Sequence, residues 1–205
     1  MEINVIPLGD IQANCYLIST DKAAVVIDPG FDSPTVTNFL KTSANKERLI
    51  LLTHSHFDHI GGALGLRNET NTKIAIGKLD NYALSNTQFN LANMFNAALT
   101  PFSADILFDN DDKILVGDIT FKVIYTPGHT VGGVCYLTDN ILFSGDTLFC
   151  RSIGRTDFYG GSYDTIKASI KNLYNSLPDD TIVLSGHGEN TTIKQEKLEN
   201  PYIRG

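Results

Sequence analysis

The chain has 205 residues, 42% of them hydrophobic and 19% charged, which predicts a single globular domain covering residues 1–205. Its formal net charge of -7 argues against nucleic-acid binding, because that function requires a concentrated basic surface. The sequence has no apolar run of about 18 residues and no signal-peptide pattern, so we expect no membrane span and a cytoplasmic location.

The first part of the chain alternates apolar runs with turn residues. Apolar, largely β-branched runs predict strands over residues 3–8, 15–19, 23–27, 49–53 and 73–76. Ser33 and Pro34 have the pattern of an N-cap followed by proline at the first helical position, so a helix is predicted from there to about Lys41. A second, short helix is expected over residues 60–67.

Residues 79–99 are predicted to be mostly helical, because their apolar side chains have a loosely helical spacing. Three of these side chains, Phe89, Met94 and Phe95, are expected to lie in the core rather than to form a lid over a substrate. An exposed apolar face on this segment would instead favour a homodimer.

Strands return after Pro101. Residues 119–125 alternate apolar and polar side chains, residues 134–137 and 141–143 form a predicted hairpin, and residues 181–184 form a last buried strand. Helices are predicted over residues 162–177 and 192–199. Two strand-rich stretches, each followed by helices, predict an α/β fold in which two sheets pack face to face with helices outside. Cys15 and Cys135 lie in apolar strands and are expected to be buried, reduced thiols.

All five histidines follow predicted strands. They are His54, His56, His59, His129 and His187. Histidine is the commonest metal ligand, and loops at strand ends on a rigid scaffold are the usual place for a functional site. Because the chain uses histidine nowhere else, we interpret all five as metal ligands.

The segment from residue 54 to residue 59 predicts ligands for two adjacent metal ions. In extended chain, His54 and His56 project to the same side and can bind one ion together. Asp58 and His59 follow where the chain turns into a helix, and they can reach a second ion. The first ion would have His54, His56, His129 and Asp146, and the second would have Asp58, His59, His187 and Asp146. Such ligands suit zinc best, although iron or manganese also accept them.

The order of these ligands resembles that of the metallo-β-lactamase superfamily over nearly the whole chain. The residues that carry the resemblance are His54-Ser55-His56-Phe57-Asp58-His59, followed by His129, Asp146 and His187. The stretches at residues 152–157, 186–193 and 196–201 are similar to those of glyoxalase II-like (hydroxyacylglutathione hydrolase-related) enzymes. The resemblance implies a four-layer αββα sandwich with a two-metal site at one edge.

The resemblance also implies an activity, namely metal-dependent hydrolysis of S-lactoylglutathione or a related acyl thiol. A hydroxide that bridges two divalent ions would attack the acyl carbon, and both ions would stabilise the developing oxyanion. Asp58 would orient this hydroxide as well as bind metal, and Asp146 would bridge the ions.

Two further residues have alternative interpretations. Asp28 precedes Pro29-Gly30 and is either a turn residue or, as the resemblance implies, a residue that supports the metal site from behind. Arg155 either binds a substrate carboxylate or forms an ion pair with Asp157.

The sequence departs from the glyoxalase II pattern in ways that bear on glutathione. Those enzymes have an additional C-terminal helical region with basic glutathione contacts and a tyrosine after the last metal histidine, whereas here Gly188-Glu189-Asn190 follows His187. A lactone or another acyl thiol is therefore an alternative substrate. A persulfide dioxygenase is the main alternative activity, with one iron bound by residues corresponding to His54, His129 and Asp146.

Overall fold

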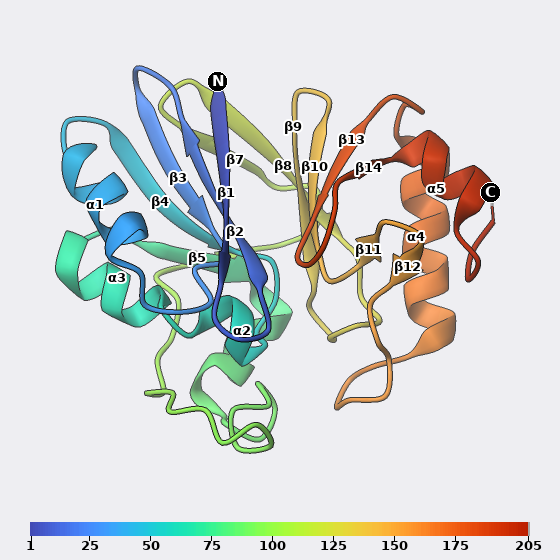
Figure 1. Ribbon diagram of the computed structural model, residues 1–205, viewed down its shortest axis with the longest axis horizontal. Coiled ribbons are helices and arrows are strands. Elements are labelled where there is room, and N and C mark those ends of the chain that lie inside the picture. The colour runs from blue at the N-terminus through green and yellow to red at the C-terminus, as the bar shows by residue number, and fades with distance from the viewer. Residues whose placement is uncertain (205) are drawn as a thin grey trace.

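The computed structural model describes residues 1–204 and contains two six-stranded β-sheets packed face to face (Figure 1). The first sheet has the order β1-β2-β3-β4-β5-β6. Its outer three strands pair antiparallel, and the pairs from β3 to β6 are parallel. The strands are β1 (Glu2–Leu8), β2 (Ala13–Ser19), β3 (Ala23–Ile27), β4 (Glu47–Leu52), β5 (Ile74–Gly77) and β6 (Ile106–Phe108).

The second sheet has the order β14-β13-β10-β9-β8-β7. Its strands pair antiparallel except for the parallel pair of β10 and β13. The strands are β7 (Lys113–Val116), β8 (Ile119–Tyr125), β9 (Val134–Thr138), β10 (Ile141–Gly145), β13 (Ile182–Ser185) and β14 (Thr191–Thr192). A small two-stranded sheet, β11 (Leu148–Phe149) and β12 (Ser152–Ile153), lies beside them.

Helices cover the outer face of each sheet, which gives the predicted αββα order of layers (Figure 1). On the first sheet these are α1 (Pro34–Thr42) and α3 (Ala63–Thr70), and on the second they are α4 (Tyr163–Ser176) and α5 (Ile193–Glu199). The short helix α2 (Phe57–Ile60) lies at the edge of the sandwich, between the layers. Within residues 1–204, no helix is long and apolar enough to cross a membrane.

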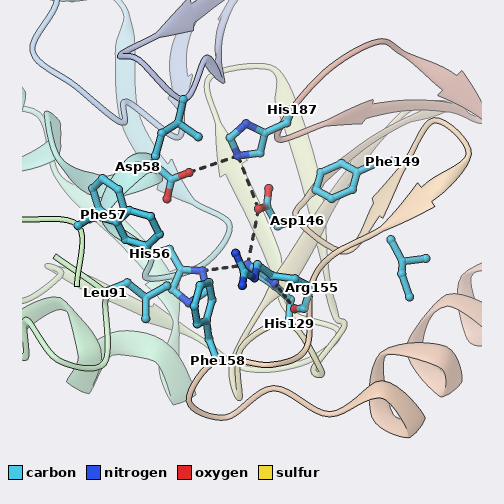
Figure 2. A pocket seen from close by; sticks show the side chains of 13 residues that line it. His56, Phe57, Asp58, Leu91, His129, Asp146, Phe149, Arg155, Phe158 and His187 are labelled. Carbon is cyan, nitrogen blue, oxygen red and sulfur yellow. Dashed lines mark hydrogen bonds and ion pairs between the residues drawn. The ribbon is translucent and has the colours of Figure 1, made fainter. Parts of the chain in front are cut away.

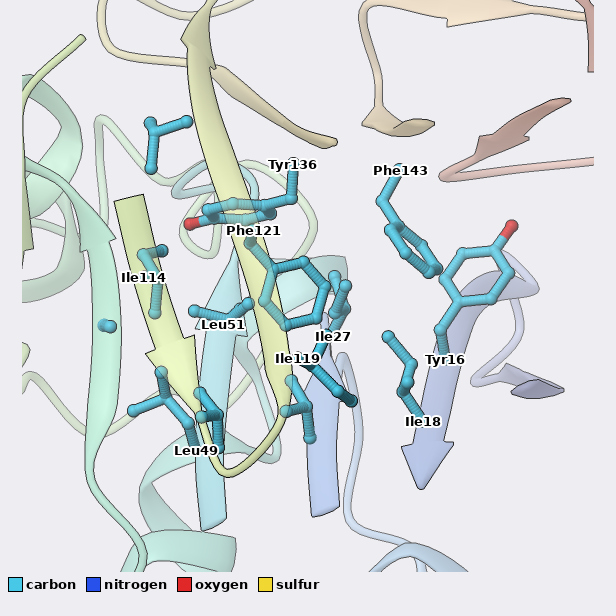
Figure 3. Packing of buried hydrophobic residues seen from close by; sticks show 14 of the residues in the cluster. Tyr16, Ile18, Ile27, Leu49, Leu51, Ile114, Ile119, Phe121, Tyr136 and Phe143 are labelled. Atoms are coloured by element: carbon cyan, nitrogen blue, oxygen red, sulfur yellow. The ribbon is translucent and has the colours of Figure 1, made fainter. Parts of the chain in front are cut away.

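The central strand β3 is buried on both faces, and its side chains alternate between them. In β3, Val25 and Ile27 point into the core between the sheets, whereas Ala24 and Val26 pack toward the helices. The core between the sheets is formed by large side chains such as Ile18 and Phe121, and it includes an edge-to-face pair of aromatic rings, Tyr16 and Phe143, with centroids 5.2 Å apart (Figure 3). This packing fixes the separation of the sheets.

Most predicted elements are present with small shifts at their ends. Ser33 caps α1 by accepting a hydrogen bond from the backbone N–H of Val36, and Ser162 caps α4 in the same way. The predicted hairpin is the β9–β10 pair. The helix expected over residues 60–67 is instead two helices, α2 and α3, with Gly61 and Gly62 between them. Cys15 and Cys135 are buried, as expected.

The prediction of a mostly helical segment at residues 79–99 was wrong. A 3-10 helix, η1 (Lys78–Ser85), is followed by turns. The side chain of Asn86 accepts from the backbone N–H of Gln88, and that of Asn90 accepts from Ala92, so these amides compete with helical hydrogen bonds. Leu91 also has a φ of 68°, which no helix contains.

Candidate metal centre

The residues predicted to bind metal lie together at one edge of the sandwich, where strands of both sheets end. His54 and His56 directly follow β4, and Asp58 and His59 lie on α2. From the second sheet, His129 follows β8, Asp146 follows β10 and His187 follows β13. The structure therefore brings together all seven positions, although they come from four strand ends that are far apart in sequence.

Three histidines form the first cluster. Nitrogen atoms of His54, His56 and His129 all lie within 4.8 Å of one another. Nδ1 of His56 is 2.9 Å from Nε2 of His129, so two ring nitrogens point at each other (Figure 2). Ring nitrogens that converge in this way are arranged for a shared cation.

Asp58, His59 and His187 form the second cluster, again with ligand atoms within 4.8 Å of one another. Nε2 of His187 is 3.3 Å from the Oδ2 atom of Asp58 and 3.3 Å from Nε2 of His59. The ring of His59 is completely buried, whereas His187 is partly exposed at the pocket surface.

The carboxylate of Asp146 lies between the two clusters (Figure 2). Its Oδ1 atom is 3.3 Å from Nε2 of His59 in the second cluster. Its Oδ2 atom is 3.6 Å from Nε2 of His129 in the first cluster and 3.6 Å from Nε2 of His187. Together the His and Asp clusters are consistent with a binuclear metal site, with Asp146 in the position expected of a bridging ligand.

The buried polar atoms of the site fit bound cations. Nε2 of His54, Nε2 of His56 and Oδ1 of Asp146 are the buried side-chain polar atoms without a hydrogen-bond partner within residues 1–204. An unpartnered buried polar atom is costly, and such atoms usually have a role beyond packing. Cations would satisfy Nε2 of His54 and Oδ1 of Asp146, whereas His56 faces the first cluster through its other nitrogen, Nδ1.

The pKa values of His54, His56 and Asp146 also suit metal binding. Burial lowers the pKa of His54 well below its usual value and that of His56 to about 3, so both rings keep free lone pairs at neutral pH. Burial alone would raise the pKa of Asp146, but the facing histidine rings, first that of His59, hold it well below its usual range. The pKa of His59 is raised, because Asp146 and Asp58 outweigh its burial. An incoming metal ion would therefore displace a proton from His59.

Hydrogen bonds on the far side of the rings fix their orientation. Nδ1 of His59 is 2.9 Å from the carboxylate of Asp28, and Nδ1 of His129 is 2.7 Å from the backbone carbonyl of Arg155. In each ring these partners hold Nδ1 and leave Nε2 directed at the site.

Asp28 lies behind the metal centre, on the side away from the pocket. Its Oδ1 atom accepts from the backbone N–H of Thr53, and its Oδ2 atom accepts from the Thr53 hydroxyl at 2.6 Å and faces His59. Although Asp28 is also near His54 and His59 as a potential ligand group, its oxygens are occupied by these bonds. This geometry matches the supporting position that the sequence resemblance implies for it.

One residue of the site was missed by the sequence analysis, namely Asp80. Its buried carboxylate accepts from the backbone N–H of Ser55 at 3.0 Å, from the hydroxyl of Thr130 at 2.8 Å and from the backbone N–H of Gly132 at 2.7 Å. Ser55 lies between His54 and His56, and Thr130 follows His129. Asp80 thus ties together the two loops that carry the first cluster.

A pocket of about 490 Å³ opens over the two clusters (Figure 2). His56, Asp58, His129, Asp146 and His187 line it, together with Arg155 and mainly apolar side chains. The volume is in the range of small-molecule sites, which is roughly 300–1,000 Å³.

Arg155 forms the ion pair that was one of its two predicted roles. Its Nε and Nη2 atoms each lie 2.7 Å from a carboxylate oxygen of Asp157, and the guanidinium lies 3.8 Å from the centroid of the Phe158 ring. Its other predicted role, binding of a substrate carboxylate, stays a prediction.

The expectation that Met94 and Phe95 lie in the core was wrong. Their side chains are 65% and 46% exposed, and Phe89 is only partly buried. Phe95 lines the pocket beside the metal clusters, and Met94 does not. The apolar spacing of this segment therefore indicated a pocket wall as much as a core.

The sandwich and the paired clusters at its edge define a class of protein, an αββα protein with histidine and aspartate side chains arranged for two metal ions. The chain belongs to the metallo-beta-lactamase superfamily, whose family model matches residues 8–187. Both the fold and the family that the ligand order predicts are thus confirmed.

Several relatives match almost the whole chain, among them two whose descriptions name an activity. A Bacillus subtilis protein described as "Probable metallo-hydrolase YqgX" is 34% identical and aligns over 97% of this chain and 96% of its own length. The hydroxyacylglutathione hydrolase GloC of Haemophilus influenzae is also 34% identical, over 99% of this chain and 98% of its own.

Solved structures give the same result. The crystal structure of BLEG-1 B3 metallo-beta-lactamase has a TM-score of 0.91 and 40% identity, with 100% of both chains covered. The crystal structure of TTHA1623 in a di-iron-bound form has a TM-score of 0.85 and 33% identity, covering 98% of this chain and 100% of its own.

Proposed function

We propose that this protein is a metal-dependent hydrolase that cleaves a thioester, S-lactoylglutathione or a related acyl thiol. The observation that carries the proposal is the pair of clusters joined by Asp146 at the floor of the pocket. The chain is 34% identical to the hydroxyacylglutathione hydrolase GloC, in an alignment that covers 99% of the chain, and this similarity supports a thioester as the substrate.

Each cluster has the ligands for one divalent ion. His54, His56 and His129 would hold the first ion and Asp58, His59 and His187 the second, with Asp146 shared. Two such ions supply Lewis-acid activation of water and stabilisation of an oxyanion. Zinc fits the histidine-rich donor set best, and the di-iron form of TTHA1623 makes iron the first alternative, with manganese after it.

The side chains around the ions have separate tasks in this reaction. The carboxylate of Asp58 lines the pocket and its pKa is lowered, because the histidines outweigh its burial, so it stays ionised and can accept a hydrogen bond from the attacking water. The water oxygen adds to the acyl carbon, the carbon–sulfur bond breaks and the thiolate leaves. One proton of the water goes to the thiolate and the other to solvent, which yields a thiol and a carboxylate. A thiolate is a good leaving group, so the reaction needs little general-acid help.

The test is a substrate panel on one preparation whose metals have been removed and replaced by zinc, iron(II) or manganese(II) in turn. We expect thioester hydrolysis that requires about two ions per chain. Oxygen uptake on glutathione persulfide with one iron per chain, and no thioester hydrolysis with any metal, would instead identify a persulfide dioxygenase. Turnover of lactones alone would move the substrate class to esters.

β-Lactam hydrolysis is a second candidate, because BLEG-1, described as a B3 metallo-beta-lactamase, is 40% identical over the whole chain. The attack on an amide carbonyl would use the same clusters. Penicillin and cephalosporin substrates therefore belong in the panel, and kcat/KM decides between the two candidates.

A further inference from the structure

The pocket over the metal clusters has apolar walls on two sides. On one side are Phe57, Leu91 and Phe158, and across the clusters from them is Phe149 (Figure 2). Phe95, which stacks on Phe57, and Ile153, in the same hairpin as Phe149, also line the pocket. These side chains come from four separate segments, α2, the turns after η1, the β11–β12 hairpin and the loop before α4.

The first wall is a connected aromatic surface. The rings of Phe57 and Phe95 stack with centroids 5.1 Å apart, and Phe158 meets Phe95 edge-to-face at 6.3 Å. Phe158 also lies 6.1 Å from the ring of His56 in the first metal cluster. The apolar surface therefore reaches from the solvent, where Phe95 is 46% exposed, to the reacting centre.

The pocket offers little to a charged substrate. Among the side chains that line it within residues 1–204, Arg155 is the one lysine or arginine. Its Nε and Nη2 atoms are bound by Asp157, and one face of its guanidinium lies against Phe158. Glutathione would bring two carboxylates, which need cationic partners to leave water. An apolar chain would instead cover the exposed ring of Phe95 and the wall beneath it.

From these walls we infer that the physiological substrate is a thioester with an apolar acyl group larger than acetyl or lactoyl, which packs against Phe57, Leu91, Phe95 and Phe158. The inference rests on the proposed thioesterase function and adds the class of acyl group. In this arrangement the pocket does not recognise a charge on the thiol part of the substrate.

The experiment measures kcat/KM for acetyl, butanoyl and hexanoyl thioesters of N-acetylcysteamine, a small uncharged thiol, and for S-lactoylglutathione, on the metal-loaded protein. A buried methylene is worth about 0.8 kcal/mol, roughly fourfold in kcat/KM. The hexanoyl ester has four more methylenes than the acetyl ester, so burial of only two of them should raise kcat/KM by more than about tenfold. It should also exceed S-lactoylglutathione.

Two variants make the test specific to the wall. Phe95→Ala should reduce the hexanoyl-to-acetyl ratio of kcat/KM by about fivefold or more. Met94→Ala is the matched control, because Met94 is the adjacent residue, is 65% exposed and does not line the pocket, so its ratio should equal that of the wild type.

The possible outcomes distinguish a failure of this inference from a failure of the proposed thioesterase function. Equal kcat/KM for all chain lengths, or a preference for S-lactoylglutathione, overturns the apolar acyl group and leaves the thioesterase intact. Failure to hydrolyse any thioester overturns both. An equal gain when the same carbons are placed on the thiol side, as in acetyl thioesters of alkanethiols, overturns the assignment of the wall to the acyl group.

Discussion

Replacing Asp80 by Asn tests whether the loops of the first cluster are held by this buried carboxylate. Asn has the shape of Asp but only one accepting oxygen. Placed where Oδ2 of Asp80 lies, that oxygen still accepts from Ser55 and Thr130, while the new NH2 group faces the backbone N–H of Gly132. The variant thus loses one hydrogen bond to a charged group, leaves the backbone N–H of Gly132 without this acceptor, and places the new NH2 group, itself a donor, against it.

The loss of this hydrogen bond determines how much the substitution lowers the free energy of unfolding. A hydrogen bond to a charged group contributes about 1.5–3 kcal/mol, so the free energy of unfolding should fall by roughly 2–3 kcal/mol. Loosening the loops should also weaken metal binding at the first cluster by about 10–100-fold, the range seen when outer partners of metal ligands are removed.

The assay is competition for zinc against a chromophoric chelator, beside urea unfolding of the metal-free protein. The matched control is Asp105→Asn, because Asp105 accepts from the backbone N–H of Ile74 at the other end of β5 and touches neither ligand loop. Zinc affinity within twofold of the wild type, with the stability loss present, would refute a positioning role and leave Asp80 a purely structural residue.

Three further outcomes are expected. Chelation of the metal should lower the free energy of unfolding by about 4 kcal/mol relative to protein with free metal at 1,000 times Kd. Calorimetry should show this as a fall in Tm of roughly 10 °C. An unchanged Tm with confirmed metal loss would contradict a structural contribution of the ions. Asp58→Ala should reduce the metal content from two ions per chain to one and abolish hydrolysis, and two retained ions with unchanged turnover would contradict the two-metal mechanism. The hydrogen bond from Arg155 lowers the pKa of Asp157 to about 2, so the ion pair should be fully formed above the ordinary range of an aspartate and be lost as the pH falls through about 2. Carboxyl NMR should show that midpoint, and Arg155→Ala should return it to the ordinary range, whereas the same midpoint in both would contradict the pairing.

Strand and ligand positions could be predicted from the sequence because each depends on local patterns. β3 is apolar at every position since both of its faces are covered, and it is followed by Asp28-Pro29-Gly30, which is a strong turn signal. The histidines stood out because they directly follow such runs and occur nowhere else. Their convergence then followed from the order of ligands shared with a known superfamily, not from spacing alone.

What the sequence did not predict depends on contacts made across the fold. Asp80 looks like any aspartate in a polar stretch, because its partners Ser55 and Thr130 are 25 and 50 residues away. The segment after η1 has a helical spacing of apolar residues, but local amide hydrogen bonds and the positive φ of Leu91 redirect it toward the pocket. No periodicity distinguishes a side chain that enters a core from one that lines a cavity.

The metal centre also depends on how the two sheets meet, because each cluster takes ligands from both. In the first cluster His54 follows β4 of the first sheet and His129 follows β8 of the second. In the second cluster His59 lies on α2, which also follows β4, and His187 follows β13 of the second sheet. The distance between ligand atoms from the two sheets is fixed only if the distance between the sheets is fixed.

Hydrogen bonds between the sheets next to the ligands fulfil this condition. The hydroxyl of Tyr136 donates to the carbonyl of Leu52 at 2.7 Å, and the backbone N–H of Val134 donates to the carbonyl of Thr53 at 2.9 Å, just before His54. On the other side, the hydroxyl of Tyr16 donates to the carbonyl of Ser185 at 2.6 Å, two residues before the last histidine ligand. Hydrogen bonds of the backbone and of tyrosine hydroxyls therefore connect the ligand loops of both clusters across the sheet interface, without using the ligand atoms themselves. The ions would in turn cross-link the sheets at this edge, which is why their removal is expected to lower stability as well as activity.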